Sequence, residues 1–224
     1  MPTSPRPSPS PTVEQPQPQH VAVIGAGLVG ALCAAMLASR GWQVDLYDAR
    51  GDPRLDSAAV QARSINLALS ARGIEALRSV NDELAARVLA EGVPMRGRML
   101  HHRPSTVGGP TRTEAQDYGV VEDGEWINSI SRTGLAIFLL DHLDGLPREG
   151  RGSVAMHFGT KLVEMDLGHD HGVTLTVADR ERGQRDVQAD FVVGADGAYS
   201  QVRRQMMRGN RCVVVREQCG TGAD

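Results

Sequence analysis

Residues 21–30 have the sequence VAVIGAGLVG, an apolar run followed by a glycine-rich turn. The run 21–24 has the length and composition of a buried strand, and the small-residue segment 31–40 after the turn favours a helix. A strand, a Gly-X-Gly-X-X-Gly turn and a helix in this order are typical of a dinucleotide-binding βαβ unit. The segment therefore predicts that a dinucleotide binds at the turn.

The three glycines of this turn have separate steric roles. Gly25 permits the tight turn, Gly27 lets the backbone approach a pyrophosphate, and Gly30 lets the helix pack closely on the strand. The pyrophosphate would meet free backbone N–H groups and the positive end of the helix dipole. A second strand, 44–47, ends at Asp48, whose carboxylate can accept hydrogen bonds from both ribose hydroxyls and would repel a 2′-phosphate. The pattern indicates the unphosphorylated adenosine of FAD or NAD rather than that of NADP.

Two simpler interpretations compete with a dinucleotide site. One is a small-residue turn without a ligand, and the other is a membrane span over the uncharged residues 21–38. The strand, the helix and the acidic residue all stand where a dinucleotide site needs them, which argues against the first. The glycines early in the stretch argue against the second. Spacing alone does not separate FAD from NAD.

A second glycine motif lies far along the chain. Residues 190–197 have the sequence DFVVGADG, which predicts a buried strand and a tight turn, and a helix is expected from Ser200. Asp196 can hold a ribose or a water molecule near a pyrophosphate, while Arg203 can neutralise a phosphate or pair with a carboxylate. The alternative is a capped turn with a surface arginine. Because the first motif already predicts a dinucleotide, we expect Asp196 and Gly197 to contact it.

Composition restricts the class of protein. The chain has 224 residues, of which 41% are hydrophobic, enough for one sizeable domain with a true core. A formal net charge of −3 gives no electrostatic case for binding nucleic acid. Cys33, Cys212 and Cys219 show no CxxC spacing and are odd in number, which suits a reducing compartment better than a disulfide framework. We expect Cys33 to be a packed, unreactive thiol.

The ends of the chain differ in composition from its middle. Residues 1–20 are dominated by Pro, Ser and Gln, which predicts a disordered leader. This leader lacks a secretory signal and the amphipathic, Arg-rich character of a mitochondrial presequence. Residues 21–208 are expected to form the folded domain, with a partial substrate-facing segment at 92–130, and residues 209–224 to form an aberrant tail.

Hydrophobic periodicity predicts the remaining elements. Helices are expected at 71–80, 82–90 and 132–143, with Ser70 as the cap of the first. Further strands are expected at 95–100, 126–130, 154–158, 161–167, 172–177 and 186–193. We expect an α/β, Rossmann-like fold: a parallel sheet on the strands at 21, 44 and 191 with helices on its faces, and an antiparallel excursion between 161 and 177. Part of a second, substrate-facing sheet is expected from 95–130.

Four more strings carry a specific resemblance. They are YDAR at 47–50, RSINLALS at 63–70, PMRGRM at 94–99 and SISR at 129–132. Together with the two glycine motifs, they resemble the FAD-dependent aromatic hydroxylases, and among these the kynurenine 3-monooxygenases, from about residue 21 to residue 208. The string at 63–70 is the most specific, because no general dinucleotide-fold argument produces it.

The resemblance implies a cofactor, co-substrates and a substrate. It implies FAD as cofactor, NADPH and O2 as co-substrates, and the hydroxylation of L-kynurenine to 3-hydroxykynurenine in tryptophan catabolism and NAD biosynthesis. The flavin supplies the oxygen-transfer chemistry, while the protein orients the substrate and excludes water. No side chain is therefore expected to act as a catalytic acid or base.

The resemblance also implies site residues. With the glycine motifs, the FAD site is implied to include Val29, Tyr47, Asp48, Ala49, Arg50, Ala68, Arg132 and Leu162. Arg98 and Tyr118 match the positions that hold the kynurenine head group. This assignment is chemically reasonable, because a guanidinium can bind a carboxylate bidentately and a phenol can add a hydrogen bond.

Two histidine clusters invite a metal interpretation. His101-His102 and the segment 169–171 contain neighbouring histidines, but neither has the i, i+4 spacing or the cysteine support of a metal site. We expect solvated histidines and no metal.

The resemblance stops after Arg208. Members of the family continue with another flavin motif, most of the substrate sheet and a C-terminal helical region, which in eukaryotes is an anchor in the mitochondrial outer membrane. We therefore expect a truncated product or an incomplete gene model that lacks the anchor, exposes sheet surface and is poorly soluble. The family location is the mitochondrial outer membrane, and the cytosol is the alternative for a chain without the anchor. Two other functions stay open: a different flavin or NAD oxidoreductase, and a non-catalytic FAD-binding fragment.

Overall fold

The computed structural model describes residues 19–55, 65–103, 109, 111–119, 126–149, 151–167 and 172–208. Of the expected leader, only Gln19 and His20 are described, and His20 already begins the first strand. The expected tail at 209–224, with Cys212 and Cys219, lies outside the described residues, as does the whole histidine segment 169–171.

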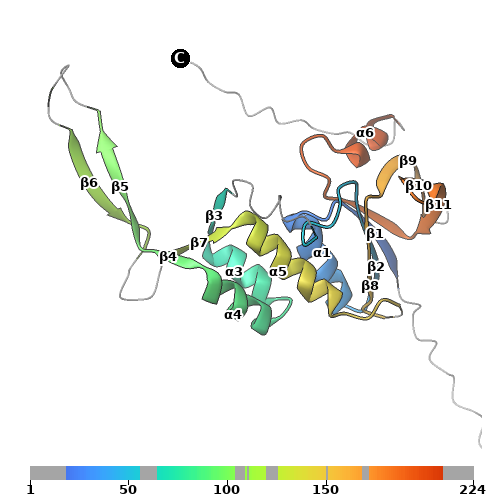
Figure 1. The fold of residues 1–224 in the computed structure, drawn as a ribbon, viewed down its shortest axis with the longest axis horizontal. Helices are drawn as coiled ribbons and strands as arrows, with labels where there is room; N and C mark the ends of the chain where they lie inside the picture. Colours follow the sequence, from blue (N-terminus) through green and yellow to red (C-terminus); the bar gives the residue numbers. More distant parts are fainter. Residues whose placement is uncertain are drawn as a thin grey trace, which may run out of the picture.

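A four-stranded parallel sheet forms the centre of the fold (Figure 1). Its strands lie in the order β12 (Phe191–Gly194), β1 (His20–Ile24), β2 (Gln43–Asp48) and β8 (Val154–Phe158). The α/β fold with a parallel sheet on the strands at 21, 44 and 191 is confirmed. The strand predicted at 154–158 is β8, which pairs in parallel with β2 and extends this sheet.

The two faces of this sheet are covered by different structures. In β1, Val21 and Val23 pack into one cluster, and the alternating Ala22 and Ile24 pack into the other. Helices cover the first face, with α1 (Leu28–Ser39) and α5 (Arg132–Asp144) nearest to the strands. The second face is covered by an antiparallel sheet of β9 (Lys161–Leu167), β10 (Val173–Asp179) and β11 (Gly183–Ala189).

The expectation of helices on the faces of the sheet therefore holds for the first face, whereas a sheet covers most of the second, to which α6 (Gln201–Arg208) adds Val202 and Met206. Leu162, Leu175 and Val177 point from the antiparallel sheet onto Ala22 and Ile24, so alternating strand residues supply the apolar cover that a second helix layer would otherwise give. The antiparallel excursion is confirmed, and it continues to the end of β11 rather than ending near residue 177.

The strand predicted at 186–193 is two strands that belong to different sheets. β11 pairs antiparallel with β10 and ends at Ala189, whereas β12 begins at Phe191 and pairs in parallel with β1. The residue between them, Asp190, donates its N–H to the His20 carbonyl over 2.9 Å, and its carboxylate accepts the His20 N–H over 2.8 Å. Asp190 thus marks the point at which the chain changes sheets.

Smaller helices and sheets extend the fold from the helical face. Helices α3 (Ala71–Arg78) and α4 (Asp82–Glu91) add Leu77, Leu84 and Val88 to the same core as α5. Asn81 and Ser131 cap α4 and α5 through their side chains. Ser70 is the N-cap residue of α3, as expected, but its side chain does not make the capping hydrogen bond that was expected of it.

The predicted substrate-facing sheet forms two separate pieces. β3 (Asn66–Leu69), β7 (Ile127–Ser131) and β4 (Val93–Met95) make one antiparallel sheet, with β7 in its centre. The strand predicted at 95–100 is interrupted at Arg96, and β5 (Gly97–His102) pairs only with β6 (Arg112–Asp117) in a hairpin that extends away from the rest of the molecule (Figure 1). The last described helix is α6 (Gln201–Arg208).

A polar cluster lies between the parallel sheet and its antiparallel cover. Asp45 on β2 accepts a hydrogen bond from His20 on β1 over 2.8 Å and from His157 on β8 over 3.0 Å. Tyr47 stacks on His157 with 4.6 Å between the ring centroids. Burial alone would raise the pKa of Asp45, but the hydrogen bonds from the two histidines outweigh it and hold this pKa well below its usual range. The Asp45 hydrogen bond also raises the pKa of His20.

Asp45→Asn should therefore destabilise the fold. We expect its free energy of unfolding at pH 6 to fall by about 2 kcal/mol, because charge-assisted hydrogen bonds from two histidines become neutral ones. Urea unfolding followed by circular dichroism measures the change. Asp166→Asn, on an exposed position of β9, is the matched control and should shift the value by less than about 0.5 kcal/mol.

The same cluster gives a pH dependence. Since the pKa of His20 is raised in the folded state, its stabilisation is complete below its ordinary value of 6.5 and is lost as the pH rises through the folded-state pKa. The difference in the free energy of unfolding between wild type and Asp45→Asn should thus shrink as the pH rises above 6.5. A difference that stays constant or grows would contradict this assignment.

Candidate functional site

The two glycine motifs are in direct contact. The Ala195 N–H donates to the Ile24 carbonyl over 2.7 Å, which joins the ends of β12 and β1. Gly25 has a φ of 109°, and a Cβ at this position would lie 2.4 Å from the Ala195 oxygen and 2.9 Å from the Asp196 Cα. Only glycine fits there, both in backbone conformation and in space. Two segments about 170 residues apart in the chain thus meet at one point, as the sequence analysis predicted.

Gly30 and Gly27 serve this turn in different ways. A Cβ on Gly30 would lie 1.7 Å from the Gly25 oxygen, so Gly30 allows α1 to pack against the turn. A Cβ on Gly27 would meet nothing within 4 Å. Gly27 is the N-cap of α1 and makes no side-chain cap, and the first N–H groups of a helix have no partner within the helix. Open space therefore lies at the end of α1 where an anion is best stabilised.

A cleft surrounds this open space. We define the central cleft as two adjoining cavities, of about 510 Å³ and 420 Å³, that share Gly27, Asp48, Arg50 and Arg132. The larger cavity is lined by Ile24, Gly25, Gly27, Tyr47, Asp48, Ala49, Arg50, Arg132, Thr160, Lys161, Leu162, Ala195, Asp196, Gly197, Tyr199 and Gln201. The cleft therefore brings together both glycine motifs, the end of β2, the start of α5 and the start of β9.

Asp48 is the buried acid of the central cleft. Its carboxylate accepts the Ala26 N–H over 2.8 Å and the Arg50 N–H over 2.8 Å. The Arg50 guanidinium adds two more hydrogen bonds, of 3.0 and 2.9 Å. Burial would raise the pKa of Asp48, but the hydrogen bonds from Arg50 and Ala26 hold it below its usual range. Asp48 is 7% exposed and the Arg50 side chain 77% exposed, so the arginine is the partner that is free to move away.

Asp196 lies in the same cleft, where its carboxylate also caps a helix. It accepts hydrogen bonds from the Ser200 hydroxyl over 2.5 Å and from the Gln201 N–H over 2.6 Å at the start of α6. Arg203 donates to the Ala198 carbonyl over 2.5 Å and is absent from the residues that line the cleft. The structure therefore shows the capped turn that the sequence analysis kept as an alternative, and this capped turn faces the cleft.

The structure brings most of the predicted cofactor residues together. Gly25, Gly27, Tyr47, Asp48, Ala49, Arg50, Arg132, Leu162, Asp196 and Gly197 all line the central cleft. Gly30 supports the turn from behind. Val29, on the first turn of α1, is 73% exposed and does not line the cleft, and Ala68 lies on β3 opposite Ser129.

The predicted substrate residues lie elsewhere, on the β5–β6 hairpin. The Arg98 Nε donates to Gln116 across the hairpin over 2.8 Å. Tyr118 follows β6, is 40% exposed and donates its backbone N–H to the Arg96 carbonyl. Arg98 and Tyr118 are thus close in the fold to each other, but neither lines the central cleft.

Sequence reasoning missed several residues of the cleft. Thr160, Lys161, Tyr199 and Gln201 line it, although none of them was assigned to the cofactor site. The Thr160 N–H donates to the Asp48 carbonyl over 2.9 Å, which joins the end of β8 to the end of β2. Their proximity to Leu162 and Asp196 in the sequence was the signal that could have found them.

The remaining predictions concern metals, thiols and membranes. Among the described residues, no group of His, Cys, Asp and Glu side chains has the arrangement of a metal site, and His102 instead lies 3.4 Å from Glu114. Cys33 is half-buried in α1, and burial raises the pKa of its thiol, as expected for a packed cysteine. No described helix combines the length and the apolar character needed to cross a bilayer.

Comparison with known proteins identifies the family. A family model described as FAD binding domain matches residues 19–211, which include both glycine motifs and the whole central cleft. The chain belongs to this family. FAD is accordingly the dinucleotide of this domain, which decides between FAD and NAD where the spacing did not.

Curated relatives of this FAD-binding chain are kynurenine 3-monooxygenases. The Saccharomyces cerevisiae protein is 41% identical over 192 residues, which cover 85% of this chain and 39% of the relative. The Yarrowia lipolytica protein is 43% identical over 84% of this chain, and the Salinispora arenicola protein 42% over 86%, each with 39% of the relative covered. The chain thus spans about two fifths of the length of these relatives.

Solved structures with the same fold are flavin monooxygenases. The complex of aklavinone-11 hydroxylase with FAD and aklavinone has a TM-score of 0.61 and 27% identity, and the match covers 86% of this chain and 35% of that one. The p-nitrophenol 4-monooxygenase of Pseudomonas putida has a TM-score of 0.64 and 21% identity, and the match covers 84% of this chain and 43% of that one. This second likeness supports the fold alone.

Gly27→Ala tests the cleft without disturbing the fold. Because a Cβ there meets nothing within 4 Å, we expect the free energy of unfolding to change by less than about 0.5 kcal/mol. We expect FAD affinity to fall by about tenfold or more, because the methyl group occupies the approach of the pyrophosphate. Quenching of flavin fluorescence measures the Kd.

Gly145→Ala is the matched control for Gly27→Ala. Gly145 ends α5, and its added Cβ would make only ordinary contacts, the nearest at 3.4 Å. This variant should keep the FAD affinity of the wild type. Equal affinity in Gly27→Ala and Gly145→Ala would show that the pyrophosphate does not approach Gly27.

Proposed function

We propose that this chain is the FAD-binding part of a monooxygenase that hydroxylates L-kynurenine to 3-hydroxykynurenine, with NADPH and O2 as co-substrates. The observation that carries the proposal is the contact between Gly25 and Ala195, which forms one FAD cleft from two motifs. Identity of about 40% to kynurenine 3-monooxygenases over most of the chain supports the choice of substrate.

The residues of the central cleft fit FAD. Gly27 and the N-terminus of α1 would hold the pyrophosphate, because backbone N–H groups and the helix dipole would stabilise its charge there. The ribose hydroxyls of the adenosine donate to Asp48. Each oxygen of this carboxylate already accepts two hydrogen bonds, so the exposed Arg50 guanidinium would have to turn away to make room for the ribose. Ala49, Leu162 and Arg132 complete the walls.

Arg98 and Tyr118 bind the amino-acid end of L-kynurenine in this proposal. The Arg98 guanidinium binds the carboxylate bidentately, and the Tyr118 hydroxyl adds a hydrogen bond. Their closeness on one hairpin supports a shared ligand. The hairpin projects from the fold, so the complete substrate site includes surfaces beyond the central cleft (Figure 1).

Bound FAD supplies the oxygen-transfer chemistry, with NADPH as the source of electrons. The protein contributes binding, orientation and exclusion of water. No described side chain of the cleft is needed as a proton donor or acceptor: Asp48 is held ionised by its donors, and Asp196 is occupied in the cap of α6. Both carboxylates therefore serve as fixed hydrogen-bond acceptors.

Asp48→Asn should weaken FAD binding by about tenfold, because an amide offers one acceptor oxygen where the carboxylate offers two charged ones. Isothermal titration with FAD measures the change. Asp166→Asn, an exposed aspartate on β9, is the matched control and should bind FAD as the wild type does. Unchanged affinity in Asp48→Asn would contradict the ribose assignment.

Loss of flavin absorbance in the FAD-loaded chain tests the function. We expect NADPH to bleach the flavin faster with L-kynurenine present than without it, and mass spectrometry to detect 3-hydroxykynurenine. A chain that binds FAD but is never bleached is a non-catalytic FAD-binding fragment. A chain bleached equally with and without L-kynurenine, and forming no hydroxylated product, belongs to a different flavin oxidoreductase.

The location of the protein stays a prediction. The relatives are enzymes of the same name from several species, and the comparisons give no compartment. We propose the mitochondrial outer membrane for the protein in a eukaryotic host and the cytosol for this chain alone. Fractionation of host cells followed by immunoblotting distinguishes the two compartments.

A further inference from the structure

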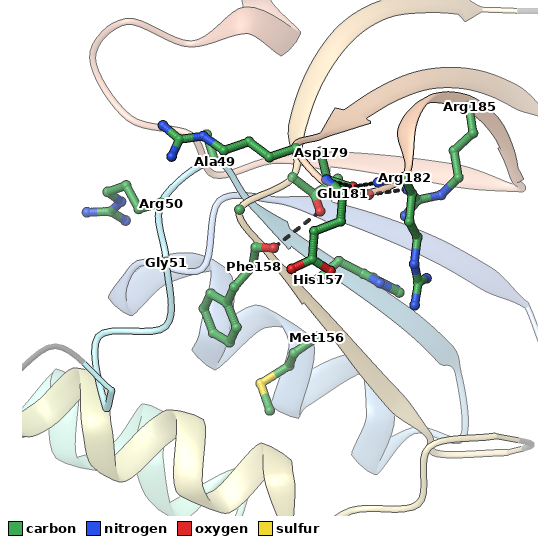
Figure 2. A pocket seen from close by; sticks show the side chains of 13 residues that line it. Ala49, Arg50, Gly51, Met156, His157, Phe158, Asp179, Glu181, Arg182 and Arg185 are labelled. Atoms are coloured by element: carbon green, nitrogen blue, oxygen red, sulfur yellow. Dashed lines mark hydrogen bonds and ion pairs between the residues drawn. The ribbon is translucent and has the colours of Figure 1, made fainter.

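A second hollow lies beside the central cleft. We call it the hairpin groove after the β10–β11 hairpin, which is distinct from the β5–β6 hairpin that carries Arg98. It is a cavity of about 750 Å³ (Figure 2). Its walls are residues 49–51 after β2, residues 156–160 at the end of β8, and residues 179–182 with Arg185 around the β10–β11 turn. Ala49, Arg50 and Thr160 line both the hairpin groove and the central cleft. The groove therefore opens onto the adenosine end of the FAD site.

The hairpin groove is rich in arginine. Its arginines are Arg50, Arg180, Arg182 and Arg185, and its carboxylates are Asp179 and Glu181. The Asp179 carboxylate is fully engaged, because it accepts hydrogen bonds of 2.5 Å from the Arg185 guanidinium and of 2.5 Å from the Arg182 N–H, and a third, of 3.0 Å, from the Glu181 N–H. This network holds the turn in place.

Two of these arginines carry uncompensated charge. In the described part of the chain, the side chains of Arg180 and Arg182 take part in no ion pair or hydrogen bond. Figure 2 shows Arg50 and Arg182 on opposite sides of the groove, with the Glu181 side chain between them. Only Glu181 opposes the free cations, so the groove presents a net positive surface to a ligand.

The chemistry of the groove complements that of the central cleft. Asp48 excludes a 2′-phosphate from the ribose of the dinucleotide in the cleft. Guanidinium groups, in contrast, bind phosphate groups through parallel hydrogen bonds, and an arginine commonly accommodates the 2′-phosphate of NADP. A phosphorylated adenosine therefore fits the hairpin groove and not the cleft.

We propose that the hairpin groove binds the adenosine 2′-phosphate of NADPH, with Arg180 and Arg182 holding the phosphate. The proposal rests on the proposed function in one respect: it takes NADPH as the reductant. It adds a site and a basis for preferring NADPH to NADH.

Binding of NADP⁺ and NAD⁺ to the FAD-loaded chain tests the groove without catalysis. We expect the double variant Arg180→Gln/Arg182→Gln to weaken the binding of NADP⁺ by about tenfold or more and the binding of NAD⁺ by less than about twofold. Isothermal titration measures both Kd values. The Kd for FAD should not change. Both arginines are exposed in a turn, so circular dichroism should show a native fold.

Matched variants separate the phosphate contact from general charge. Arg72→Gln, an exposed arginine on α3 outside the groove, should leave NADP⁺ affinity unchanged. Glu181→Gln should raise the affinity for NADP⁺ by about twofold to threefold, because it removes the negative charge that opposes the phosphate. Adenosine 2′,5′-bisphosphate should compete with NADP⁺ at concentrations at which inorganic phosphate does not, which distinguishes a nucleotide site from a general anion site.

Several results would overturn the proposal. In the double variant, they are an equal loss of affinity for NADP⁺ and NAD⁺, or an unchanged affinity for NADP⁺. In the controls, they are the same loss of NADP⁺ affinity in Arg72→Gln, or competition by inorganic phosphate as strong as that by the bisphosphate. A wild-type chain that does not bind NADP⁺ would also overturn the proposal. If L-kynurenine is hydroxylated while the double variant keeps its affinity, the groove assignment alone fails. If the double variant selectively loses NADP⁺ while L-kynurenine is never hydroxylated, the proposed substrate fails and the groove stands.

Discussion

The close approach of Gly25 to Ala195 is the constraint on which the rest of the site depends. It allows the turn after β1 and the turn after β12 to share one space, and the Ala195 N–H bonded to Ile24 joins their strands. Any side chain at position 25 would force these turns apart. The central cleft exists because two backbones approach more closely than residues with a Cβ permit.

Two acidic groups then determine where a phosphate group is repelled and where it can bind. Asp48 is buried, ionised and surrounded by donors, so it favours neutral ribose hydroxyls over another anion. On the other side of Arg50, Asp179 is neutralised by Arg185 and by backbone N–H groups, which leaves two arginines of the same turn without carboxylate partners. The two neighbouring regions thus differ in charge: the end of β2 carries a buried carboxylate, and the β10–β11 turn carries arginines.

The antiparallel cover of the central sheet connects these two regions. β9 supplies Leu162 to the cleft, and the β10–β11 turn supplies Arg180 and Arg182 to the groove. Leu175 and Val177, both buried, hold this sheet on Ala22 and Ile24 of β1. The polar cluster of His20, Asp45 and His157 lies in the same layer, and it reflects pairing between strands that are far apart in the sequence.

The sequence by itself determined the elements whose signals are local. Gly25, Gly27 and Gly30 with Asp48 lie within one βαβ unit, so their spacing predicts the turn and a dinucleotide ligand, without deciding between FAD and NAD. Only the tertiary structure decided which sheet each later strand joins: β8 lies in the parallel sheet, and the chain changes sheets at Asp190. It also decided that Thr160 and Lys161 line the cleft while Arg98 does not. Local periodicity reports which face of a strand is buried, but not which partner buries it, because pairing is set by contacts between segments distant in the chain.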